Sequence, residues 1–330
     1  MKNRLTALAI SVIMICMCAV SCSEKPANLH TFEARIGEEP FKATYLTDKS
    51  DGTVFTEAEI AEIDSALSTT LGEATKVFSG FNSEGIYSVN ERVDAVLKCS
   101  EDVISLIEYT YSLTELTKGA YQPVMGAVTD IYFSDGVTEI TDEMLAESLT
   151  HTGNHLITVD GNNVYKADRE AKFDLDSILE GVVIRDAGAV LASKNVTYAV
   201  INFKESTATF GSLAEDEPLD MAVQLSGDTE THSGILSFND MTVTVHGADS
   251  FVVDNETGKK KVSEFDTVIV MSRDAILSSI IADIVYGMSA DEIIKLHNEG
   301  YLDFEAVMIY ADGEFVKTSE EIVYEKTVNE

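Results

Sequence analysis

The order of helical and strand-like patterns is the feature that most limits what this chain can fold into. Apolar residues three and four positions apart predict helices over 56–71, 93–116, 141–149, 177–193, 274–286 and 289–300. Short runs bounded by turn residues predict strands at 196–203, 208–210, 222–225, 235–238, 242–245, 267–271 and 304–310. Because several strands follow one another without a helix between them, the sequence favours an α+β domain with mixed or antiparallel sheets packed against helices over a doubly wound fold.

A basic start and an apolar run occupy the N-terminus. Lys2 and Arg4 open the uncharged stretch from Leu5 to Val20, and small residues precede Cys22. This is the layout of a secretory signal peptide, and its end resembles a bacterial lipobox, in which the chain is cut before the cysteine and the thiol takes a diacylglycerol. An uncleaved anchor helix is the alternative, although the run is a little short of the ~20 residues that a membrane span needs.

The lipobox resemblance implies how the chain is divided and where it works. Residues 1–21 are expected to be a lipoprotein signal peptide and 22–40 a lipid-anchored tether, so the chain is exported and held on a bacterial membrane through Cys22. Two or more acyl chains anchor a protein stably where one would not. We expect residues 41–325 to form one large domain or two intimate subdomains.

Acidic residues dominate the composition. The chain has 57 Asp and Glu against 23 Lys and Arg, a net charge of −34, and removing the signal with its two basic residues would make it −36. This argues against binding nucleic acid or anionic lipid head groups through charge. Cys99 is the one cysteine left after the signal and Cys22 are assigned, so we expect neither an intramolecular disulfide nor a cysteine metal site.

Several familiar catalytic motifs are absent from the sequence. It has no phosphate loop, no dinucleotide glycine fingerprint, no nucleophile elbow and no His-Glu-x-x-His. The six histidines are scattered, and His246, at a strand end before Gly247, is the one we expect to face a cleft. A lone histidine of this kind is nevertheless more often structural.

Five blocks occur in a characteristic order. They are FNSEGIYSVN at 81–90, GAYQPVMGAV at 119–128, DLDSILEG at 174–181, VVDNETGKK at 252–260, and the helix after Met271. This order resembles the FAD:protein FMN transferase (ApbE) family of exported, often lipid-anchored proteins, over about residues 56–310. The second block is the most specific, because the family has Gly-Ala-Phe-Asp-Pro and a later glycine there.

The resemblance implies an ApbE-like (T-fold-like) architecture and a defined chemistry. Members bind FAD and Mg²⁺ outside the cytoplasmic membrane, cleave the pyrophosphate and move FMN onto a threonine or serine of a redox partner protein; some instead hydrolyse FAD. Such chemistry needs a cation at the pyrophosphate, a cleft with backbone donors and a base for the acceptor hydroxyl. FAD, Mg²⁺ and a flavin-acceptor protein are therefore the implied ligands and partner.

The resemblance also assigns cofactor-binding positions in four of the blocks. They are Asn90, Gly119, Ala120, Tyr121, Gln122, Pro123, Glu180, Gly181 and Thr257. Gln122 replaces the family aspartate, so it keeps a hydrogen bond but loses the anionic charge. Asn90 has a helix N-cap as its alternative role, and the second block could be a simple turn. Asp174 could orient its turn or cap the helix.

Two positions in or between the blocks depart from the family pattern. Phe251 stands at the family histidine of the fourth block and cannot take a proton, so we expect His246 to substitute as base, with Asp254 as the second catalytic candidate. Lys204 and Glu205 replace a Gly-Gly pair, and their side chains would crowd a backbone approach to phosphate.

The metal positions implied by the resemblance are the carbonyl of Leu179 and the side chains of Ser279 and Asp283. A spacing of four places the two side chains on one helical face, which permits weak magnesium binding. A shifted alignment would use Asp274 and Ser278 instead. An ordinary helix with Asp283 in water is the structural alternative.

Three hypotheses follow for function. The first is Mg-dependent FMN transfer from FAD by an enzyme with several altered motif positions. The alternative is a non-catalytic lipoprotein of the same fold that binds flavin or a redox partner; an acidic scaffold that keeps only the fold is a third reading.

Overall fold

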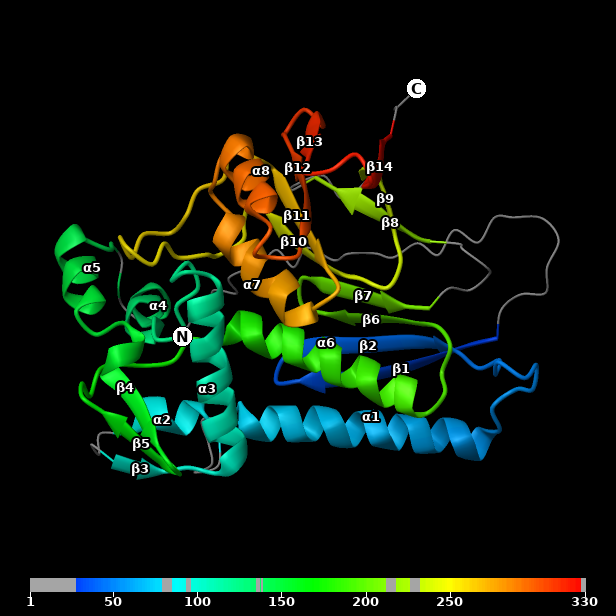
Figure 1. Cartoon of the computed structure of the whole chain (residues 1–330), viewed down its shortest axis with the longest axis horizontal. Helices are drawn as coiled ribbons and strands as arrows, with labels where there is room; N and C mark the ends of the chain where they lie inside the picture. Colours follow the sequence, from blue (N-terminus) through cyan, green and yellow to red (C-terminus); the bar gives the residue numbers. More distant parts are fainter. Residues whose placement is uncertain are drawn as a thin grey trace, which may run out of the picture.

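The computed structural model describes residues 28–78, 85–92, 96–134, 137, 139–211, 218–225 and 232–327. One large sheet, antiparallel throughout, organises this part of the chain (Figure 1). In their order across the sheet its strands are β1 (Leu29–Ile36), β2 (Glu39–Leu46), β6 (Ala199–Phe203), β7 (Ser206–Phe210), β10 (Thr242–Gly247), β11 (Thr267–Ser272), β12 (Glu305–Ile309) and β13 (Phe315–Lys317).

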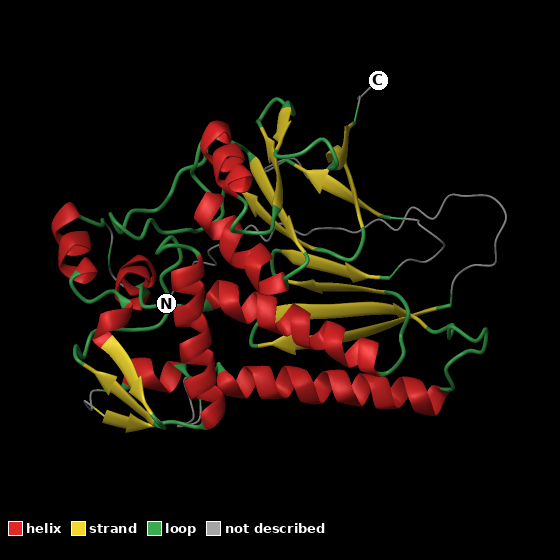
Figure 2. Cartoon of the chain, viewed as in Figure 1, coloured by secondary structure: helices red, strands yellow, loops and turns green. Residues whose placement is uncertain are grey.

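Helices cover one face of this sheet (Figure 2). α1 (Glu57–Val77) and α6 (Asp176–Ser193) pack against β1, β2 and β6, and α7 (Ala275–Val285) packs against β10 and β11. α8 (Ala290–Glu299) follows α7 and contacts β12. Thr56 with Glu59 and Ser289 with Glu292 form capping boxes at the starts of α1 and α8. Their side chains accept hydrogen bonds from backbone N–H groups that have no partner within the helix.

Two small sheets flank the large one. β14 (Val323–Lys326), β9 (His232–Phe238) and β8 (Leu219–Gln224) pack their apolar side chains against the second face of β10–β12. β3 (Val96–Lys98), β5 (Asn163–Lys166) and β4 (Ile157–Asp160) lie at one end of the molecule. Around them are the remaining helices, α2 (Tyr87–Glu91), α3 (Glu101–Leu116), α4 (Gly126–Phe133), α5 (Asp142–Leu149) and the short 3₁₀ turn η1 (Asn154–Leu156).

α6 lies between two hydrophobic clusters. Ile178 and Val182 pack with α3 and α7, whereas Ile184 and Ala187 pack with α1, β2 and β6. A helix that is apolar on both sides has to be enclosed, and this position brings its N-terminal turn to the junction of α7, β10 and the loop after α3. The α+β class with antiparallel sheets is therefore confirmed.

Two predicted segments differ from the structure. Residues 29–40, expected within the tether, form β1 and the start of β2, because Phe32, Ala34 and Ile36 alternate inward onto the core of α1 and α6. The helix predicted over 93–116 begins at Glu101, because Ser100 caps it there and Val96–Lys98 pairs with β5. Cys99, between them, is buried in the core of this region.

Some sequence predictions fall outside the described residues. Cys22, the signal peptide and the first tether residues precede residue 28, and residues 81–84 of the first block are also not described. Within the described ranges we find no helix whose length and apolar character would let it span a bilayer.

Candidate functional site

Hydrogen bonds join the sequence blocks at one place in the fold. The Asp174 backbone N–H donates to the Pro123 carbonyl at 2.8 Å, and Asn255 Nδ2 donates to the Ala120 carbonyl at 2.6 Å. Lys261, directly after the fourth block, reaches the C-terminal turn of α7. The second, third, fourth and fifth blocks thus meet around the start of α6 and the end of α7.

Asp283 is the acidic centre of this junction. Its Oδ1 lies 2.9 Å from His246 Nε2, and its Oδ2 accepts from the Ser177 hydroxyl on α6. The contact forms because β10, which ends at Gly247, packs against α7. Both carboxylate oxygens therefore already have partners from neighbouring elements.

His246 is enclosed at the end of β10. It is 7% exposed, its ring packs edge-on against Tyr286 with centroids 5.6 Å apart, and Tyr286 in turn donates to the Gly247 carbonyl. Nδ1 is buried and has no hydrogen-bond partner among the described residues. Asp283 therefore fixes the orientation of the imidazole and leaves Nδ1 as its unused position.

Further carboxyl groups surround the start of α6. Burial raises the pKa of Asp174 to about 6, with the negative charge of Asp176 adding to the effect. Burial also raises the pKa of Glu180 well above its usual range, reinforced by Glu205, and Glu180 Oε1 has no partner in the described chain. Burial therefore favours the protonated form of both carboxyl groups more than water does.

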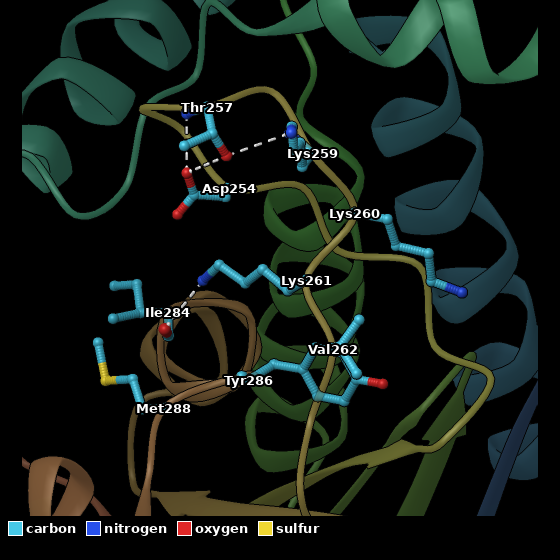
Figure 3. A pocket seen from close by; sticks show the side chains of 10 residues that line it. Asp254, Thr257, Lys259, Lys260, Lys261, Val262, Ile284, Tyr286 and Met288 are labelled. Carbon is cyan, nitrogen blue, oxygen red and sulfur yellow. Dashed lines mark hydrogen bonds between the residues drawn. The ribbon is translucent and has the colours of Figure 1, made fainter. Parts of the chain in front are cut away.

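A cavity of about 280 Å³ adjoins this junction, between the loop at 254–262 and the end of α7. Figure 3 shows Lys261 extending across it toward the carbonyl of Ile284, with Asp254 and Thr257 on the opposite side. The volume is just below the range for ligand pockets, roughly 300–1,000 Å³. It is large enough for part of a dinucleotide.

The residues expected to bind the cofactor serve largely to hold the loops around the site. Asn90 lies inside α2, so it is not an N-cap; its amide donates to the Phe173 carbonyl at 2.8 Å and accepts from the Phe173 N–H at 2.7 Å. Its polar atoms are thus committed to the segment before α6. This link attaches the first block to the third.

The second block forms a tight turn at the end of α3. Gly119 has a φ of +88°, a left-handed conformation that favours glycine. Tyr121 is 7% exposed and its hydroxyl has no partner among the described residues, and Gln122 Oε1 is likewise buried without a partner there. Two unsatisfied polar atoms on one turn mark it as a ligand-facing candidate, because such groups are rare in folded proteins.

Gly181 has a packing role. A Cβ on it would lie 2.4 Å from Ile276 Cα and 2.8 Å from the Ala275 carbonyl, so α6 and α7 approach each other through this glycine. Asp254 and Thr257 also interact with each other: Asp254 Oδ1 accepts from the Thr257 N–H at 2.8 Å and from its hydroxyl at 2.6 Å. Although burial opposes it, these bonds lower the pKa of Asp254.

The predicted metal ligands do not form a magnesium site. Ser279 is 1% exposed and its hydroxyl donates to the Ala275 carbonyl on its own helix, and Asp283 is held by His246 and Ser177. The Leu179 carbonyl lies inside α6. The alternative pair fails as well, since Asp274 caps α7 and Ser278 bonds to the Thr242 and Val270 carbonyls. In the described chain no three side chains of His, Cys, Asp or Glu gather into a metal site, and Mg²⁺ demands near-octahedral oxygen coordination.

Phe251 and Lys204, at two positions that depart from the family pattern, contact neighbouring elements. The Phe251 ring packs on Tyr132 and Phe133, with centroids 5.1 and 4.8 Å apart, and so lies toward α4. Lys204 has a φ of +50° in the β6–β7 turn and its ammonium lies 3.5 Å from Asp176 Oδ2. The turn therefore brings a positive charge to the start of α6.

Sequence reasoning missed Ser177 and Lys261. Ser177 lies within the third block but resembles any polar residue of a first helical turn. Lys261 completes the run Lys259–Lys261, an unusual basic cluster in so acidic a chain, and this run was the available signal.

Residues 42–308 match the model of the ApbE family. The chain belongs to the ApbE family. The resemblance drawn from the five blocks is therefore confirmed. No curated protein matches the chain.

Solved structures of ApbE proteins have the same fold. The flavin transferase ApbE of Vibrio cholerae superposes with a TM-score of 0.71 at 17% identity, covering 88% of this chain and 97% of that one. The apo flavinyl transferase ApbE of Pseudomonas stutzeri gives 0.70 at 15% identity over 88% and 94%, and the ApbE protein of Thermotoga maritima gives 0.72 at 16% over 88% and 97%. At such identities these structures establish the shared fold, and the site must be argued from this chain's own residues.

Proposed function

We propose that this protein is a flavin transferase of the exported, lipid-anchored kind: it binds FAD at the junction of α6, α7 and β10 and transfers FMN to a threonine or serine of a redox partner protein. The observation that carries the proposal is the meeting of four ApbE blocks around the hydrogen-bonded pair His246–Asp283. The match to the family over residues 42–308 supports it.

The chain's own residues can supply the acid–base part of this reaction. The acceptor oxygen would bond to the phosphorus of the FMN phosphate, the bond to AMP would break, and the hydroxyl proton would pass to His246. Asp283 holds the ring through Nε2, so Nδ1 is the nitrogen left to receive the proton. The paired carboxylate would stabilise the imidazolium formed.

An assay for AMP release and for covalent flavin on an acceptor protein tests the proposal. We expect the domain from residue 28 to label the acceptor, and His246→Asn to lower the rate by roughly 10²–10⁴-fold. His155→Asn, at an exposed histidine, is the matched control and should keep the wild-type rate. Equal rates for the wild type and His246→Asn would contradict the role of His246.

A second candidate is a non-catalytic flavin-binding protein of the same fold. It is favoured by the inward-turned Ser279 and by Phe251 at the position of the family histidine. Calorimetry with FAD separates the two. Binding without AMP release or acceptor labelling would support this candidate and reject transfer.

A further inference from the structure

The ammonium of Lys261 lies where negative groups from two elements meet. Nζ donates to the Asp283 carbonyl at 2.8 Å and to the Ile284 carbonyl at 3.0 Å. Carbonyls in the last turn of a helix lack helical partners and carry negative partial charge. Burial lowers the pKa of Lys261, while the charges of Asp283 and Asp254 act in the opposite direction.

The backbone on both sides of Lys261 holds it close to the end of α7. The Lys261 N–H donates to the Val252 carbonyl at 2.8 Å, which fixes the start of the side chain. Gly287, just after α7, has a φ of +87°, and a Cβ there would lie 3.2 Å from Lys261 Cβ and 3.3 Å from the Val262 carbonyl. The close approach therefore needs glycine on the helix side.

We propose that Lys261 supplies in this chain the positive charge expected from a divalent cation, so that the chain binds the diphosphate of FAD without a metal ion. The inference rests on the proposed function. An ammonium has three N–H donors, two of which are used on α7, so one remains for a phosphate oxygen in the adjoining cavity (Figure 3). The hydroxyl of Ser279 and the carboxylate of Asp283 are hydrogen-bonded within the protein and do not form a ligand set for Mg²⁺. This also favours a lysine over a metal ion as the source of positive charge.

Calorimetry of FAD binding in EDTA and in Mg²⁺ buffer tests the inference. We expect the wild-type dissociation constant to differ by less than about twofold between the buffers, because the charge is built in. Lys261→Gln keeps donors for the α7 carbonyls but removes the charge, and should weaken binding at least about tenfold. Lys261→Arg should restore most of the affinity. Lys295, on α8, is exposed, so Lys295→Gln removes the same charge away from the cavity and should bind FAD as the wild type does.

A titration with Mn²⁺ alone, followed by electron paramagnetic resonance, gives a readout that needs no flavin. We expect no Mn²⁺ site tighter than about 1 mM in the wild type. A tighter site, FAD binding that is lost in EDTA, or unchanged binding by a folded Lys261→Gln would overturn the inference. If the wild type bound no FAD in either buffer, the proposed function itself would fall, and the inference with it.

Discussion

Asp174 makes the stability of the domain depend on pH in a direction opposite to most carboxylates. Its pKa is raised to about 6 in the folded chain from 3.8, so the folded state binds a proton more tightly than the unfolded one. Between pH 6 and 4 the folded state gains stability as the pH falls, and above pH 6 the group costs at most ~3 kcal/mol.

Asp174→Asn should therefore stabilise the domain at pH 7 by ~1–3 kcal/mol, and this stabilisation should shrink as the pH falls from 6 to 4, where the wild-type carboxyl takes up its proton. Urea unfolding at several pH values measures both effects. Asp312→Asn, at an exposed turn residue near β13, is the control and should leave the profile unchanged. A difference between Asp174→Asn and the wild type that stayed the same from pH 7 down to pH 4 would contradict a raised pKa of Asp174 in the fold.

Residue roles could be predicted from the sequence only in part. The spacing of Ser279 and Asp283 correctly placed both on α7, but the spacing alone does not predict which face of the helix is buried against other elements. Ser279 faces the interior, where its hydroxyl has only its own helix to bond. Ser177 and Asp283 are 106 positions apart, so their contact depends on the packing of α6 on α7.

At the scale of elements, the packing of α6 on α7 depends on one glycine. Gly181→Ala would place a methyl group 2.4 Å from Ile276 Cα, against backbone that cannot yield cheaply. We expect a loss of about 3 kcal/mol or more in the free energy of unfolding, measured by urea denaturation.

Gly188, two turns later in the same helix, provides the matched comparison. Its Cβ would meet only Ile201 Cδ1, at 3.7 Å, so Gly188→Ala should stabilise by ~0.5–1 kcal/mol through helix propensity. Similar effects of the two substitutions would mean that α6 and α7 are not in the close contact described.

The elements themselves were predictable where their patterns were long. The capping box of Thr56 and Glu59 correctly marked the start of α1. Short apolar runs were not resolved, since Val96–Lys98 continues the apolar spacing of α3 yet pairs with β5. For β1, the alternation of Phe32, Ala34 and Ile36 was present in the sequence and indicates a strand with one buried face.

At the scale of the whole molecule, charge limits how the domain can reach a membrane. The net charge of −34 would repel an anionic bilayer surface. We propose that the N-terminal segment holds the protein on a membrane, through lipidation at Cys22. Two acyl chains would hold the domain stably, since each buried CH₂ contributes ~0.8 kcal/mol.

Cys22→Ser should therefore abolish membrane association almost completely, because the acidic domain is not attracted electrostatically to an anionic membrane surface. Expression of the full chain in a bacterial host, followed by detergent phase partitioning, measures this: the wild type should enter the detergent phase and Cys22→Ser the aqueous phase. Cys99→Ser removes the buried thiol instead and should partition as the wild type. Detergent partitioning of Cys22→Ser would favour the uncleaved anchor helix, because an apolar run from Leu5 to Val20 that remained on the chain would need no lipid.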